Sequence, residues 1–120
     1  MTKCIGIIGS RRRDTTADFL LTLDAFLTVY TDGDTIVSGG CPKGGDRFAE
    51  MIASRQNVPI KIYYPNWAKF GRSAGFVRNT DIARDADVLI ACVAPDRMGG
   101  TEDTIRKFQQ FHPDGKVLVR

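Results

Sequence analysis

The side chains in this sequence that are best suited to chemistry are cations placed among glycines and aromatic rings. Residues 66–80, NWAKFGRSAGFVRNT, combine three cations with two glycines, two phenylalanines and Trp67. Arg78 falls in the first turns of an expected helix, where its guanidinium could form two hydrogen bonds to a phosphate. Trp67 could stack on a base or pack against a partner chain. The alternatives are a surface ion pair of Arg78 with Asp81 or Glu102, and a place in the core for Trp67.

Two glycine-rich turns could supply a second part of an anion site. The first is SGGCPKGGD over residues 38–46, and the second is GGT over residues 99–101. Glycines let backbone N–H groups approach an anion, and the N-terminus of a following helix adds about half a positive charge. Neither turn is a P-loop or a GxGxxG fingerprint, so phosphate binding is predicted without a full dinucleotide fold. The alternative is that these glycines only permit positive φ in tight turns.

Further charged residues lie beside these turns. Asp103 follows the second turn, where the helix dipole alone favours a carboxylate, but it could also face the pocket and act on a ribose hydroxyl or a water. Asp46 could cap the helix after the first turn. Lys43 could meet a phosphate as a point charge. Arg11 has a weaker claim, because it belongs to a run of three arginines.

Short apolar runs alternate with longer helical patterns, and this order would position the candidate residues. It predicts an α/β fold, a Rossmann-like three-layer sandwich with about five mainly parallel strands in the order 3-2-1-4-5. Ligands in such a sheet bind outside the carboxyl ends of the strands, near the point where the strand order reverses. The expected strands are residues 4–10, 35–40, 58–64, 87–94 and 116–119, and the expected helices are 16–30, 45–57, 74–86 and 100–111. The 3-4 spacing in the first helix predicts an inward face made of Phe19, Leu20, Leu23, Phe26, Leu27 and Tyr30.

Length and composition limit the classes of protein that fit. The 120 residues predict one domain, 1–120, and the 42% hydrophobic and 26% charged residues are ordinary for a globular protein. The net charge of +3 is mild, so a nucleic-acid partner is not expected. The three cysteines lack CxxC spacing, which predicts neither a disulfide framework nor a metal site, and no cofactor is expected. The sequence shows no signal-peptide pattern and no membrane-length apolar run, and we expect a cytoplasmic protein.

Four blocks of the sequence resemble a known superfamily. These are IGSRRRD, IVSGGCPKGGDRFAE, YYPNWAKFGRSAGFVRNTDIARDADVLIA and GGTEDTIRKF, which together cover nearly the whole chain. They resemble the SLOG superfamily, and within it the YspA/YpsA-related branch of small Rossmann-like proteins. More distant relatives are the "Lonely guy" cytokinin-activating phosphoribohydrolases and the DNA-processing protein of natural transformation.

The resemblance implies a nucleotide pocket at the rim of the sheet, often in a homodimer. It puts the ligand-binding positions at Gly9, Ser10, Gly39, Gly40, Asp46, Arg78, Gly100 and Thr101. The turns and loops themselves add Arg11, Lys43, Gly44, Trp67, Asn79 and Gly99 to the expected ligand-binding set. In the phosphoribohydrolases an arginine and two glutamates cleave an N-glycosidic bond. Arg78 matches that arginine, whereas Asn79 stands where a lysine would be, Asp103 stands at the catalytic glutamate position, and Thr104 replaces the usual second acid.

Three functions follow as hypotheses. The first is a sensor or sequestering protein that binds a nucleotide-type small molecule and forms a homodimer. The second is a nucleotide N-glycosidic hydrolase, in which Asp103, or Glu102 in a shifted register, stabilises charge on the ribose while Arg78 holds the 5′-phosphate. The third is single-stranded DNA binding, which the modest net charge disfavours. The missing second acid favours binding over hydrolysis.

Overall fold

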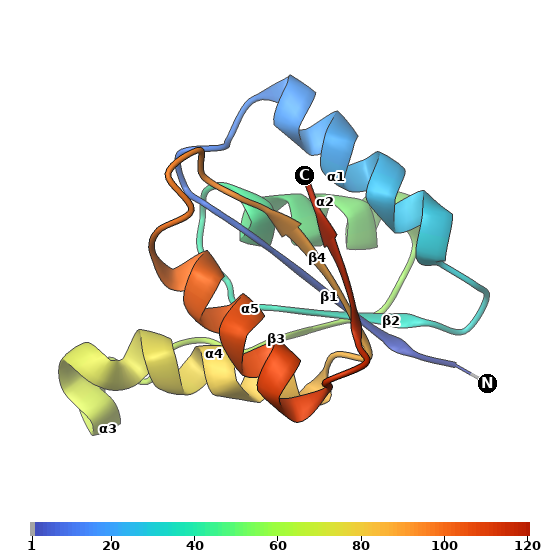
Figure 1. Cartoon of the computed structure of the whole chain (residues 1–120). Helices are drawn as coiled ribbons and strands as arrows, with labels where there is room; N and C mark the ends of the chain where they lie inside the picture. The colour runs from blue at the N-terminus through green and yellow to red at the C-terminus, as the bar shows by residue number, and fades with distance from the viewer. Residues whose placement is uncertain (1) are drawn as a thin grey trace.

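A computed structural model describes residues 2–120 as a five-stranded, all-parallel sheet between two layers of helices (Figure 1). The strand order is β3-β2-β1-β4-β5, as the sequence predicted. The strands are β1 (Cys4–Gly9), β2 (Thr35–Ser38), β3 (Ile60–Ile62), β4 (Val88–Cys92) and β5 (Lys116–Val119). The helices are α1 (Thr16–Val29), α2 (Gly45–Gln56), α3 (Trp67–Phe70), α4 (Ala74–Asp85) and α5 (Gly100–Phe111), and a 3-10 turn, η1 (Gly71–Ser73), joins α3 to α4.

The central position of β1 follows from its register and its burial. Ile5 pairs with Ile36 of β2 on one side and with Val88 of β4 on the other. Successive residues of a strand point to opposite faces, and both faces are apolar here because helices cover both. Ile5 and Ile7 pack in the core under α1 and α2, whereas Ile8 packs in the core under α4 and α5.

Helix α1 begins at a capping box and buries a different stripe from the one expected. The Thr15 side chain accepts a hydrogen bond from the Asp18 N–H, and the Asp18 carboxylate accepts one from the Thr15 N–H. Phe19 is buried, as predicted. The prediction was wrong for Leu20 and Leu27, which are each 55% exposed. The buried face instead consists of Asp18, Phe19, Thr22, Ala25 and Phe26.

The stretch between β3 and α4 forms a short, projecting segment. Asn66 caps α3 by accepting a hydrogen bond from the Lys69 N–H at 3.1 Å. Gly71 then adopts φ 56°, a left-handed conformation that glycine tolerates, and the chain passes through η1 into α4. Figure 1 shows this segment, in yellow-green, beyond the N-terminal end of α4. Trp67 is 60% exposed, so the core alternative for this residue was wrong.

Across residues 2–120, no helix combines the length and the apolar character needed to cross a membrane.

Candidate functional site

A cleft of about 790 Å³ opens at the carboxyl ends of β1, β2 and β4. Its walls come from the loops after these strands, from the loop between β3 and α3, and from the first turns of α4 and α5. This edge is the one at which a doubly wound sheet binds ligands. The expected ligand-binding residues that line the cleft are Gly9, Ser10, Arg11, Gly39, Gly40, Asp46, Trp67, Arg78, Asn79, Gly99, Gly100 and Thr101.

Lys43 and Gly44 belong to the same turn but do not line the cleft. The Gly44 N–H donates to the Asp14 carboxylate at 2.7 Å, and Arg47 donates to the same oxygen at 2.9 Å. These bonds lower the pKa of Asp14, the Gly44 bond more than the Arg47 bond. A Cβ on Gly44 would lie 2.3 Å from the Ser10 carbonyl oxygen. The second half of this turn therefore caps and packs α2, and Asp14 occupies the place expected for an anion.

Gly45 has a comparable packing role. A Cβ on Gly45 would lie 2.1 Å from the carbonyl carbon of Ile8 and 2.2 Å from the nitrogen of Gly9. Only a glycine lets the first turn of α2 approach the backbone of β1 this closely. The positive-φ alternative weighed from the sequence therefore fits Gly44, which adopts φ 75°, whereas Gly45 has no positive φ and is needed for this close packing instead.

Arg78 lies in the cleft with its guanidinium held by neutral oxygens. Its Nε donates to the Asn79 side-chain oxygen at 3.0 Å, and its Nη1 donates to the Gly39 carbonyl. The ion-pair alternative was wrong: Asp81 pairs with Arg84 at 3.1 Å, and Glu102 pairs with Arg97 at 2.9 Å. Among residues 2–120, no carboxylate lies within ion-pair distance of Arg78. Two of the five guanidinium donors are used, which leaves three for other partners.

Asn79 and Asp103 form a buried pair behind Arg78, each of them less than one-tenth exposed. The Asn79 side-chain nitrogen donates to the Asp103 carboxylate at 3.2 Å and to the Gly100 carbonyl at 3.3 Å. Asp103 also accepts from Arg106 at 2.5 Å and from Lys107 at 2.9 Å. Neither Asp103 nor Glu102, the two expected catalytic acids, lines the cleft.

Asp46 is the acidic residue that lines the cleft. Its carboxylate accepts from the Ser38 hydroxyl at 3.0 Å and from the Cys41 N–H at 3.1 Å, so it holds the Gly39–Gly40 turn rather than capping α2. Burial raises the pKa of Asp46, although the Cys41 bond and the charge of Arg78 act in the opposite direction. The capping interpretation of this residue was wrong.

The N-terminus of α5 gives open access to backbone N–H groups. Gly99 precedes it with φ 109°, and no side chain caps this end of the helix. A Cβ on Gly99 would meet no heavy atom within 4 Å, and one on Gly100 would meet only the Asn79 side-chain nitrogen, at 3.7 Å. Neither glycine is required by packing, unlike Gly44 and Gly45. The positive φ of Gly99 favours glycine by itself, as the alternative weighed from the sequence expects, whereas Gly100 has no positive φ. The turn suits a ligand that needs close approach to the backbone.

Exposed apolar side chains line the mouth of the cleft. Trp67 is 60% exposed, Tyr64 66% and Met98 69%. The Tyr64 ring packs on Gly40, where a Cβ would lie 2.5 Å from the ring. Tyr64 and Met98 were not predicted as site residues, although each stands next to a recognised turn: Tyr64 follows β3, and Met98 precedes the GGT turn.

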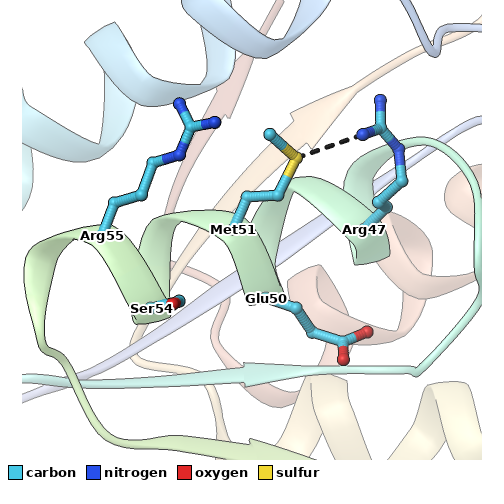
Figure 2. A pocket seen from close by; sticks show the side chains of 5 residues that line it. All are labelled: Arg47, Glu50, Met51, Ser54 and Arg55. Carbon is cyan, nitrogen blue, oxygen red and sulfur yellow. Dashed lines mark hydrogen bonds between the residues drawn. The ribbon is translucent and has the colours of Figure 1, made fainter.

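A second, smaller hollow of about 360 Å³ lies along α2 (Figure 2). Its two cations already have partners: Arg47 donates to the Met51 sulfur at 3.2 Å and pairs with Asp14, and Arg55 lies over the Phe19 ring at 5.2 Å. These contacts pack α2 against its surroundings, and all the residues that line the hollow belong to α2. The cleft at the strand ends is the better candidate site.

Comparisons with known proteins add no assignment. No protein-family model matches the chain, and no curated protein matches it significantly. Within residues 2–120, no three His, Cys, Asp or Glu side chains are grouped so that they could hold a metal ion. The function of the cleft is therefore inferred from its own geometry and charge.

Proposed function

We propose that this cleft binds a nucleotide or a nucleotide-derived small molecule, as a sensor or sequestering protein of the SLOG superfamily would. The phosphate would lie between the Arg78 guanidinium and the N-terminal turn of α5. The base would lie beside Tyr64 and Trp67 at the mouth. The observation that carries this proposal is Arg78, which lines the cleft beside the uncapped helix and forms no ion pair with any carboxylate of the described residues.

The charges around the cleft support an anionic ligand. Residues 51–80 contain five arginines and lysines and no acid. Arg12, also in the cleft wall, pairs with Asp96 at 2.7 Å, but Arg11 and Arg78 have no such partner among the described residues. Within residues 2–120, the buried Asp46 is the single carboxylate in the wall. A cleft in which one sign of charge predominates concentrates ligands of the opposite sign.

The exposed rings support a ligand with a planar group. Aromatic and apolar side chains that remain exposed at a pocket mouth gain free energy when a ligand covers them. Tyr64 and Trp67 belong to the cleft wall and are both more than half exposed. A nucleobase supplies a flat apolar face, and base–aromatic stacking contributes about 1–3 kcal/mol per base in nucleic-acid complexes.

The state of the acids favours binding over hydrolysis. A catalytic carboxylate must reach the reacting atoms. Asp103 instead accepts hydrogen bonds from Asn79, Arg106 and Lys107, and Glu102 pairs with Arg97. Neither acid has a place in the cleft wall. We therefore propose a protein that binds its ligand without cleaving it, and we include in the proposal the homodimer that the SLOG resemblance implies.

The test uses Trp67, the single tryptophan of the chain, as a fluorescent reporter in the cleft. Adenosine 5′-monophosphate, adenosine and inorganic phosphate are titrated into the wild type, Arg78→Ala and the control Arg84→Ala. Arg84 lies on the same helix but outside the cleft, paired with Asp81 and Asp85. We expect the nucleotide to bind most tightly, and Arg78→Ala to weaken it at least about tenfold, because charge-assisted hydrogen bonds are lost.

Two results would count against the proposal. Equal nucleotide affinity for Arg78→Ala and the wild type would remove Arg78 from the site. Chromatography would detect any release of free base from the nucleotide. Release by the wild type that is abolished in Asp103→Asn would show that the protein is a hydrolase. Light scattering of the purified protein tests the homodimer separately.

A further inference from the structure

We infer that Asp103 is a positioning residue: through Asn79 it fixes the direction in which the Arg78 guanidinium points into the cleft. The effect of Asp103 on ligand binding rests on the proposed function, whereas the arrangement of the three side chains itself needs no ligand. It gives Asp103 a role other than the catalytic one expected from the sequence. Its central step is the contact of Asn79 on α4 with Asp103 and Gly100 on α5, the two helices that border one side of the cleft.

The side-chain amide of Asn79 can adopt only one orientation between its neighbours. The Arg78 Nε is a donor and lies 3.0 Å from the amide oxygen. The Asp103 carboxylate and the Gly100 carbonyl are acceptors and lie 3.2 and 3.3 Å from the amide nitrogen. A flipped amide would place a donor against a donor and an acceptor against two acceptors. Asp103 and Gly100 therefore determine that the oxygen of Asn79 faces Arg78.

Asp103 is itself held firmly enough to act as an anchor. It is 5% exposed, and its two oxygens accept from Arg106 and Lys107 one turn further along α5. Those cations compensate the cost of burying its charge. The carboxylate thus faces Asn79 across the α4–α5 contact, not the cleft.

This positioning determines how the unused N–H donors of Arg78 are presented to a ligand. With Nε bound to Asn79 and Nη1 bound to Gly39, the guanidinium plane is fixed at two points. The remaining donors form a planar fork that can meet a phosphate only if the plane is held. Without the Asn79 bond the side chain gains rotamers that point elsewhere. A ligand must then order the side chain, which reduces its affinity.

Asp81 offers a matched control for substitutions at Asp103. It pairs with Arg84 at the same i,i+3 spacing at which Asp103 pairs with Arg106, and it lies on α4 outside the cleft. The variants are Asp103→Ala, Asp103→Asn and Asp81→Ala. Asn at position 103 keeps an acceptor for the Asn79 nitrogen, whereas Ala does not. If Asp103→Ala is too unstable for measurement, Asp103→Leu removes the acceptor while filling the space.

The first readout needs no ligand. The Nε–H of Arg78 is observed by ¹⁵N NMR, assigned from its absence in Arg78→Lys, and its hydrogen exchange is measured. We expect protection in the wild type, Asp103→Asn and Asp81→Ala, and faster exchange in Asp103→Ala or Asp103→Leu. Exchange at the wild-type rate in the Ala and Leu variants would overturn the inference, because Asp103 would then not hold Arg78.

The second readout separates this inference from the proposed function. Adenosine 5′-monophosphate is titrated against each folded variant, with Trp67 fluorescence as the signal. We expect about five- to tenfold weaker binding for Asp103→Ala, and a change within about twofold for Asp103→Asn and Asp81→Ala. Equal affinity in all variants would overturn the coupling to binding. If the wild type binds neither the nucleotide nor phosphate while the NMR pattern holds, the proposed function is wrong and the positioning of Arg78 stands.

Discussion

Gly100→Ala should stabilise the protein and at the same time weaken its ligand binding. Gly100 is the first residue of α5, and its φ lies outside the left-handed region. The atom nearest to an added Cβ is the Asn79 side-chain nitrogen at 3.7 Å, an ordinary van der Waals contact. An alanine that fits a helical position stabilises by about 0.5–1 kcal/mol, because the unfolded chain loses freedom and helix propensity rises. For a chain of this size, that is an increase in Tm of roughly 3 °C.

The effect on binding should have the opposite sign. A phosphate at this turn would accept hydrogen bonds from backbone N–H groups at the start of α5, and these groups are accessible because Gly99 and Gly100 have no side chains. A methyl group on Gly100 stands in that approach. Loss of one or two charge-assisted hydrogen bonds corresponds to about tenfold or more in Kd.

Thermal melts with and without adenosine 5′-monophosphate measure both effects on one sample. Ser54→Ala is the control, because Ser54 is exposed on α2 outside the cleft and an alanine there also favours the helix. We expect a higher Tm for both variants without nucleotide, and a reduced nucleotide-dependent shift for Gly100→Ala alone. A stabilised Gly100→Ala that keeps the full nucleotide shift would show that no ligand approaches this turn. A destabilised one would show that Gly100 serves packing.

Two further predictions concern the frame around the site. Gly45→Ala should destabilise the protein by about 3 kcal/mol or more, because its Cβ would lie 2.1 Å from the backbone of Ile8, which cannot move aside. Denaturant unfolding of this variant and of Gly100→Ala should show changes in unfolding free energy of opposite sign. Burial opposes ionisation of Asp34, but hydrogen bonds from Lys3 and Thr31 outweigh it and lower its pKa from 3.8 to about 2. Because the folded-state pKa is the lower one, this stabilisation of about 2 kcal/mol is present above pH 4 and is lost as the pH falls toward 2. Asp34→Asn should flatten the dependence of unfolding free energy on pH in that window, and an unchanged slope would contradict the assignment.

The sheet could be predicted from the sequence because its determinants are local. Five apolar runs separated by helical patterns give the element order, and the right-handed crossover rule then limits the topology. The fully buried β4, with no exposed position, is typical of a central strand. The inward face of α1, in contrast, could not be predicted from the local sequence. Apolar residues occur almost all round this helix, and the buried stripe is selected by distant contacts. The Phe19 ring packs on Phe48 at 5.6 Å, and Arg13, which pairs with Asp18 at the start of the helix, also donates to the Val93 carbonyl.

The two halves of the first glycine turn show why part of the site could not be predicted. Gly39–Gly40 and Gly44–Gly45 look alike in the sequence. The first pair lines the cleft beside Arg78, whereas the second is packed against β1 and its first N–H is bound by Asp14. Asp14 is thirty residues away, and its place at the end of the IGSRRRD block does not indicate that it binds this turn. Spacing identifies a turn that can bind an anion, but only the tertiary structure shows which of its N–H groups already donate to a carboxylate of the protein.

The same distinction applies to the acids. Motif order draws attention to Asp103, which follows the GGT turn. Of the described acids, however, only Asp46 belongs to the cleft wall, and burial raises its pKa. A shifted carboxyl in a cleft is the usual mark of acid–base chemistry. Here its oxygens hold Ser38 and Cys41, and so fix the turn that presents the Gly39 carbonyl to Arg78. Asp46 in one wall and, as we infer, Asp103 behind the other thus serve the same end, which is to fix the position of a single guanidinium.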